Sequence, residues 1–135
     1  MKSKILKVKS DLKNLGAIRK FLISFLEQKN VKKEIIASLA LALTELCENL
    51  IKYGYKEKKG DIKIQVIATN KNIKINILDK GEPFDISNYK PPDIKQNLKK
   101  GIGGKMGIKI IKLMCDKIIY NTNRGINKTT LVKYK

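Results

Sequence analysis

Apolar and polar residues alternate along several short segments of this chain, and a period of two predicts β-strands that bury one face. Two short turns, Thr69-Asn70-Lys71-Asn72 and Asn123-Arg124-Gly125, lie between such segments and predict hairpins. The predicted strands are residues 3–9, 62–68, 73–78, 117–121 and 128–134.

Other segments have apolar residues at every third or fourth position, which predicts helices. Residues 11–29 form the first of these segments. A second helix is predicted from Val31 to Gly54, with Asn30 as its N-cap. The centre of this helix is apolar nearly all round, so we expect it to be deeply buried. A third helix is predicted from Met106 to Cys115.

The order of these elements favours an α+β fold. Because no strand–helix–strand repeat is present, we expect a two-layer α/β sandwich with a mixed, mainly antiparallel sheet and helices on one face. With 135 residues the chain is long enough for a single domain, residues 1–135. Residues 86–104 are rich in lysine and interrupted by proline and glycine, which is typical of a long loop that closes over a ligand.

The net charge of +18 raises the question of nucleic acid, but the composition argues against specific binding. All but two of the 30 basic residues are lysine, whereas base-reading proteins favour the two-pronged guanidinium of arginine. Aromatic residues, on which single-stranded nucleic acids stack, make up only 6% of the chain. We therefore interpret the lysines mainly as a solvated surface. An acidic protein partner is the next alternative, and a nucleic-acid partner is the third.

Two further features concern the protein's chemistry and location. Cys47 and Cys115 lie far apart in sequence on predicted helices, so we interpret them as small buried apolar side chains. The absence of histidine argues against a zinc site. The apolar runs are short, and the N-terminal segment lacks the long apolar stretch of a signal peptide. We therefore expect a cytoplasmic protein without a membrane span.

Three short motifs contain the candidate chemistry. Glu45 and Asn49 stand four residues apart on the second predicted helix, so a potential base and a potential ligand for a hard cation share one face. Asp79 and Gly81 follow a predicted strand, where a ligand can approach the backbone closely. The run Gly101-Ile102-Gly103-Gly104-Lys105-Met106-Gly107 precedes a predicted helix, and its backbone N–H groups are suited to phosphate oxygens. Together these motifs indicate a nucleotide site.

The order and spacing of the motifs resemble those of the anti-sigma-factor serine/threonine kinases, a branch of the GHKL superfamily of histidine-kinase-like ATPases. The resemblance covers nearly the whole chain and implies a Bergerat-type ATP-binding fold. The matching segments are Leu41 to Tyr55 (the family's N-box), Asp79 to Asp85 (G1 box), Gly103 to Asp116 (G2 box) and Lys128-Thr129-Thr130-Leu131.

The resemblance also implies a role for each matched residue. Glu45 would be the general base that takes a proton from an attacking hydroxyl, and Asn49 would ligate Mg²⁺ on the triphosphate of ATP. Asp79 would accept a hydrogen bond from the adenine amino group. Thr130 would support Asp79 and adenine, with Thr129 as the alternative. The other expected nucleotide-binding residues are Gly81, Gly103, Gly104, Lys105, Met106, Gly107 and Ile108.

Three positions depart from the family's pattern. Tyr53 stands where histidine is common, Lys105 interrupts the paired glycines, and Lys128 stands where glycine often precedes the threonine pair. Lys105 is a candidate contact for the γ-phosphate. None of these changes removes the residues expected as base, metal ligand and adenine reader, so ATP binding is still expected.

The resemblance implies an ATP- and Mg²⁺-dependent kinase that takes part in partner switching. Such a kinase phosphorylates a Ser or Thr of a STAS-type anti-anti-sigma protein, alternately binds a sigma factor, and commonly acts as a homodimer. Two alternatives stay open. One is a nucleotide-gated sequestering module without significant kinase turnover, and the other is a related kinase that acts on a STAS switch unconnected with sigma factors.

Overall fold

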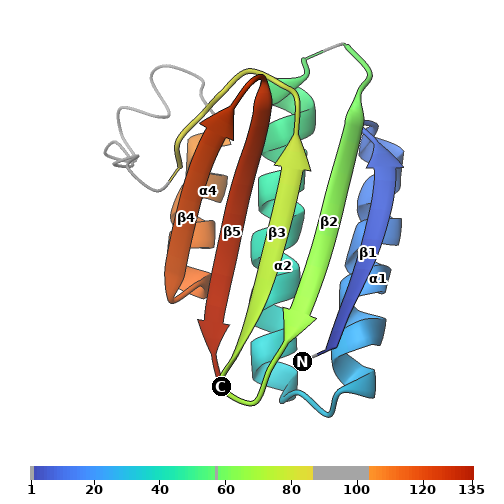
Figure 1. Ribbon diagram of the computed structural model, residues 1–135, viewed down its shortest axis with the longest axis vertical. Coiled ribbons are helices and arrows are strands. Elements are labelled where there is room, and N and C mark those ends of the chain that lie inside the picture. The colour runs from blue at the N-terminus through green and yellow to red at the C-terminus, as the bar shows by residue number, and fades with distance from the viewer. Residues whose placement is uncertain (1, 57, 87–103) are drawn as a thin grey trace.

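The computed structural model describes residues 2–56, 58–86 and 104–135, and these residues form two layers. One layer is a five-stranded sheet, and the other is a set of α-helices that covers one face of it (Figure 1). The strands are β1 (Lys2–Lys9), β2 (Asp61–Ala68), β3 (Asn72–Asp79), β4 (Lys117–Asn123) and β5 (Ile126–Tyr134). The helices are α1 (Leu15–Gln28), α2 (Lys33–Asn49) and α4 (Gly104–Met114).

The strands are arranged in the order β1-β2-β3-β5-β4, and every neighbouring pair is antiparallel. The predicted two-layer α+β architecture, with its mainly antiparallel sheet and one-sided helices, is therefore confirmed. A mixed sheet would contain at least one parallel pair, and none is present among the described strands. Strands β3 and β4 run in the same direction, but β5 lies between them and is antiparallel to both.

The pairing of β3 with β5 decides which side chains face the helices. Ile75 pairs with Leu131, and Asp79 pairs with Asn127. Directly paired residues point to the same face, and Ile75 and Leu131 are fully buried, so these positions face the helix layer. Thr129 lies on the same face because it is two residues from both Asn127 and Leu131.

Helix α2 packs between α1 and α4 and runs along the helix-covered face of the sheet behind its middle strands (Figure 1). The predicted deep burial of this helix is confirmed, since Leu39, Leu43 and Leu46 are almost completely inaccessible to solvent. The two cysteines are buried and free, as expected. Among the described residues, no helix combines the length and apolarity needed to cross a lipid bilayer.

Asn30 does not cap α2, contrary to the prediction. It has a φ of 58°, and its N–H donates to the carbonyl oxygen of Glu27 at 3.1 Å, so it ends α1 instead. Asparagine tolerates this left-handed conformation better than most residues, which suits it to a helix C-terminus. Helix α2 begins at Lys33, after the extended residue Lys32.

Both predicted hairpins are present. In the first, Thr69 N–H donates to the carbonyl oxygen of Asn72 at 2.9 Å. In the second, Arg124 and Gly125 both have positive φ, 53° and 79°, which is the backbone conformation that a tight two-residue hairpin turn requires. Strands β4 and β5 are each about two residues longer than the predicted segments.

Candidate functional site

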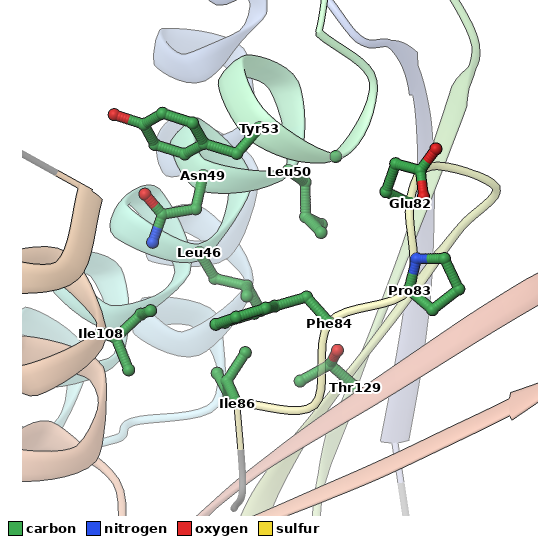
Figure 2. Close-up of a pocket in the computed structure, with 11 residues that line it drawn as sticks. Leu46, Asn49, Leu50, Tyr53, Glu82, Pro83, Phe84, Ile86, Ile108 and Thr129 are labelled. Atoms are coloured by element: carbon green, nitrogen blue, oxygen red, sulfur yellow. The ribbon is translucent and has the colours of Figure 1, made fainter. Parts of the chain in front are cut away.

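A pocket of about 230 Å³ opens between the C-terminal half of α2, the first turns of α4 and the segment after β3 (Figure 2). Its lining is mostly apolar. The volume lies below the roughly 300–1,000 Å³ of pockets that enclose a whole small molecule, so the pocket suits one part of a ligand, such as a flat base. The lining residues are Leu46, Asn49, Leu50, Tyr53, Gly54, Glu82, Pro83, Phe84, Ile86, Ile108 and Thr129.

One wall of the pocket is a π-helical turn, Leu50–Gly54, which continues α2. Tyr55 N–H donates to the carbonyl oxygen of Leu50 at 2.8 Å, five residues back, and so closes the wide turn. Wide turns of this kind occur frequently at functional sites because they redirect side chains. Here the turn places Leu50 and Tyr53 in the pocket wall (Figure 2).

Glu45 and Asn49 lie together against the first turns of α4. A Cβ atom on Gly107 would lie 2.6 Å from Oε2 of Glu45 and 3.4 Å from Nδ2 of Asn49. The two side chains therefore point toward the same glycine, as their spacing on one helix face predicts. Nδ2 of Asn49 is buried and has no hydrogen-bond partner among the described residues, so the protein leaves this amide free to bind a ligand.

The electrostatic surroundings of Glu45 favour its protonated form. Burial raises the pKa of its carboxyl group, the neighbouring Glu48 carboxylate raises the pKa further, and Lys52 opposes the shift. Lys52 is itself paired with Glu48 at 2.6 Å. A raised pKa brings a carboxylate closer to the value at which it accepts protons efficiently near neutral pH.

Asp79 is buried at the end of β3, with 2% of its surface exposed. Its Oδ1 accepts hydrogen bonds from Gly81 N–H and from Nδ2 of Asn127, both at 2.9 Å. Its Oδ2 is buried and has no hydrogen-bond partner among the described residues. Burial raises the pKa of Asp79, while the bonds from Asn127 and Gly81 lower it. A buried acceptor without a donor is costly, which marks Oδ2 as a candidate ligand contact.

The turn after Asp79 is held tightly against the end of the π-helical turn. A Cβ atom on Gly81 would lie 2.7 Å from the backbone carbon of Gly54, so this close approach requires glycine. Glu82 N–H donates to the carbonyl oxygen of Gly54 at 2.9 Å. The Tyr55 hydroxyl accepts from Lys80 N–H at 2.7 Å, and these contacts fix the backbone beside Asp79.

Thr130 does not lie beside Asp79, and this part of the prediction is wrong. It points to the open face of the sheet, where its hydroxyl donates to Oδ1 of Asn76 at 2.7 Å. The alternative, Thr129, points to the helix face and lines the pocket (Figure 2). Both threonines are buried, so burial does not distinguish them, and the strand register decides.

Asn127 is 2% exposed and bonded directly to Asp79, but it is not among the site residues predicted from the sequence. Tyr120 and Thr122 are not among them either, and both donate to Oδ1 of Asn127. One signal was present in the sequence. Asn127 stands two residues before Thr129, and alternation places residues two apart on one face of a strand.

The glycine-rich segment is described only in part. Gly103 lies outside the described residues, and so does almost all of the loop predicted at 86–104. Helix α4 begins at Gly104, two residues before the predicted start. Within it, Ile108 is buried and lines the pocket, whereas Met106 is 39% exposed. Lys105 belongs to the first turn of α4.

Gly107→Ala should separate stability from activity. The new methyl group would displace the Glu45 carboxylate, which is the movable end of a half-buried side chain. Alanine favours a helix interior by about 1 kcal/mol over glycine, so the thermal stability should stay equal or rise. If Glu45 has the base role that the family resemblance implies, its displacement by about 1 Å can cost up to 10²-fold in rate, and we expect a loss of about tenfold in the phosphotransfer that the resemblance implies.

The matched control is Gly16→Ala, because Gly16 is helical and a Cβ there meets no atom within 4 Å. It should gain similar stability without losing activity. Equal activity in Gly107→Ala and the control would contradict the close packing of Glu45 against α4.

Comparisons with known proteins agree with this geometry. A family model described as histidine kinase-like ATPase domain matches residues 8–133. The chain is 27% identical over 103 residues to the serine-protein kinase RsbW of Bacillus thuringiensis, and this match covers 73% of the chain but only 64% of the relative's length. To the serine-protein kinase RsbW of Bacillus subtilis it is 23% identical over 137 residues, which cover 96% of the chain and 83% of the relative.

A solved structure supports the same fold. The RsbU and RsbW domains of Rv1364c from Mycobacterium tuberculosis match with a TM-score of 0.71 at 15% identity, over 98% of this chain and 32% of that one. The resemblance inferred from the motifs is therefore confirmed at the level of family and fold.

Proposed function

The chain belongs to the histidine kinase-like ATPase family, and we propose that it is an ATP-dependent protein kinase that phosphorylates a Ser or Thr hydroxyl. The observation that supports transfer, beyond nucleotide binding, is the placement of Glu45. Its carboxylate lies beside Asn49 and against the N-terminal turns of α4, with a raised pKa. A family relative that only held a nucleotide would not need a base at this position.

The proposed reaction is an in-line transfer of the γ-phosphoryl group. Glu45 takes the proton of the acceptor hydroxyl while the hydroxyl oxygen bonds to the γ-phosphorus, and ADP leaves with the bridging oxygen. Phosphoryl transfer needs little covalent chemistry from the protein, so positioning and electrostatic stabilisation dominate. The N-terminal turns of α4, which include Lys105, are suited to the phosphate groups because free N–H groups and the helix dipole favour negative charge.

Asn49 is the proposed protein ligand for Mg²⁺. A carboxamide oxygen is a hard donor of the kind that Mg²⁺ prefers, and Asn49 lies in the pocket wall, where its Oδ1 could serve as that ligand. When bound, Mg²⁺ would neutralise charge on the triphosphate. Among the described residues, no group of three or more His, Cys, Asp or Glu side chains is close enough to hold a metal, so the proposal assigns the remaining ligands to ATP and water.

Asp79 and Thr129 are proposed to recognise adenine. The unpartnered Oδ2 of Asp79 can accept a hydrogen bond from the exocyclic amino group, and Thr129 replaces Thr130 as the supporting threonine. The apolar side chains of the pocket, including Leu46 and Ile108, would pack on the faces of the ring.

The proposed partners are a STAS-type anti-anti-sigma protein as acceptor and a sigma factor that the kinase sequesters. The printed names of the relatives, serine-protein kinase RsbW, support protein kinase activity. The motif resemblance adds the two partners, and on this proposal the chain is a cytoplasmic regulator of transcription that acts as a homodimer. The excess of lysine would speed association with acidic partner surfaces.

The test is incubation of the full chain with γ-labelled ATP, Mg²⁺ and a STAS-domain protein from the same organism. Transfer of label to a Ser or Thr of that protein is expected. A stable complex without transfer would instead support the nucleotide-gated sequestering module, and transfer without any sigma-factor binding would support the kinase of an unrelated STAS switch.

Asn49→Ala should abolish the tightening of ATP binding by Mg²⁺ while leaving the fold intact, because the proposed protein ligand of the ion is lost. ATP affinity is measured by calorimetry with Mg²⁺ and with EDTA. Asn70→Ala, which changes an exposed turn residue, is the matched control and should keep the wild-type difference. The same Mg²⁺ dependence in wild type and Asn49→Ala would show that the metal assignment is wrong.

A further inference from the structure

The side chain of Asn127 uses all of its hydrogen-bonding groups inside the protein. Its Nδ2 donates to Oδ1 of Asp79 and to the carbonyl oxygen of Gly81, both at 2.9 Å. Its Oδ1 accepts from the Thr122 hydroxyl at 2.7 Å and from the Tyr120 hydroxyl at 3.2 Å. If the amide turned over, its oxygen would face two acceptors, so this orientation is the only one that satisfies the network.

The network determines which oxygen of Asp79 remains available. A carboxylate can rotate by half a turn and exchange its two oxygens, so by itself it has no preferred free atom. Asn127 and Gly81 N–H both donate to Oδ1, and Oδ2 is left without a donor. The pairing of Asp79 with Asn127 across β3 and β5 makes this arrangement part of the sheet.

The same network extends to the wall of the pocket. The Tyr120 hydroxyl, which donates to Asn127, also accepts from Phe84 N–H at 3.1 Å. The Phe84 side chain lines the pocket (Figure 2). Asn127 therefore joins the buried carboxylate, the Gly81 turn and the pocket wall through one side chain that is almost completely buried.

We propose that Asn127 is a positioning residue that sets selectivity for a 6-amino purine, by holding Asp79 so that Oδ2 is the acceptor for the amino group. This inference rests on the proposed function. A 6-oxo purine presents a carbonyl oxygen at the same place, and two acceptors facing each other are unfavourable. Asn127 does not itself touch the base and acts through Asp79.

The experiment compares the affinities of the wild-type chain and of Asn127→Ala for ADP and for IDP, which differ only by the amino or oxo group at position 6. The wild type should bind ADP more tightly than IDP. In Asn127→Ala the ratio of the two affinities should fall about tenfold, as expected for the loss of one well-oriented hydrogen bond to a charged group. Thr130→Val is the matched control. It removes a similarly buried hydrogen bond, to Asn76 on the open face of the sheet, and should leave the ADP to IDP ratio unchanged.

A purely structural role gives a different result. If Asn127 only stabilised the fold, Asn127→Ala would weaken ADP and IDP binding equally, and that outcome would overturn the proposal. Combination with Asp79→Asn provides a second measurement. Because Asn127 acts through Asp79, adding Asn127→Ala to Asp79→Asn should change the ratio no further, and an additive loss would count against the proposal.

Two outcomes separate this inference from the proposed function. Wild-type chain that binds neither nucleotide would refute the proposed function and the inference with it. Wild-type selectivity for ADP that persists in Asn127→Ala would refute the inference alone. If the alanine variant does not fold, Asn127→Leu keeps the approximate shape of the side chain and removes the Nδ2 donor. It should lose at least as much selectivity, and retention of the wild-type ratio would overturn the proposal.

Discussion

Glu45→Gln is expected to reduce phosphotransfer by about 10²–10⁴-fold, the usual contribution of a general base, while ATP and acceptor binding stay near normal. Glutamine keeps the shape and most of the hydrogen bonding of glutamate, but it cannot accept the hydroxyl proton. Since Gly107 leaves room for the carboxylate, the slightly different glutamine head group fits the same space.

The measurement is the rate of phosphate transfer at saturating ATP and acceptor, so that differences in binding do not contribute. Glu34→Gln makes the same chemical change in the exposed first turn of α2 and should retain the wild-type rate. Full activity in Glu45→Gln would exclude the base role and leave positioning as the means of catalysis.

Asp79→Asn is expected to weaken ADP binding by about 1–3 kcal/mol, because a charge-assisted hydrogen bond to the base is lost. The amide oxygen can still accept from Asn127 and Gly81, but the group that replaces Oδ2 is a donor and cannot accept from adenine. Calorimetric titration with ADP measures the effect.

The matched control for this change is Asp116→Asn at the other end of the sheet, where Oδ2 of Asp116 accepts from Tyr134 N–H at 2.7 Å. It removes one carboxylate and should leave ADP affinity unchanged. An ADP affinity equal to that of the wild type in Asp79→Asn would remove Asp79 from the nucleotide site.

The same substitution should change the dependence of stability on pH. Burial raises the pKa of Asp79 in the folded state above its ordinary value of 3.8. The folded protein then holds this proton to a higher pH than the unfolded chain does. Ionisation of Asp79 therefore costs stability as the pH rises from about 3.8 through the folded pKa, and the cost stays constant above it.

Asp79→Asn removes that cost, so its stability relative to the wild type should increase across this pH window and keep the gain at neutral pH. Urea unfolding of both proteins over a pH series gives the difference. A difference that is flat, or that falls with pH, would contradict the assignment of a desolvated carboxylate. An Asp79 variant that is more stable but binds less ADP would show a ligand site maintained at the expense of stability.

Much of the site was predictable because its residues are close in sequence. Glu45 and Asn49 lie on one helix, where a spacing of four places two side chains on the same face whatever the rest of the fold does. Asp79 was predictable because it ends a clearly alternating strand and is followed by Gly81. The raised pKa of Glu45 agrees with the apolar sequence around it.

The errors concern contacts between distant segments. Thr129 and Thr130 alternate like any neighbouring strand residues, and only the pairing of Ile77 with Thr129 shows which of them faces the helices. A shift of one residue in that pairing would exchange the two faces, and no local pattern decides between them. Asn30 was assigned to the wrong helix because asparagine is favoured both at helix starts and in left-handed positions at helix ends.

The sequence by itself determined the fold class, which residues of a helix or strand share a face, and the three motifs of the site, because the period of a helix or a strand is a property of the local backbone. Tertiary structure alone decided which residues meet. It brought Asn127 to Asp79 across 48 residues and packed Gly107 against Glu45. These contacts depend on strand register and helix packing, which result from burying the whole core at once, so short stretches of sequence do not contain them.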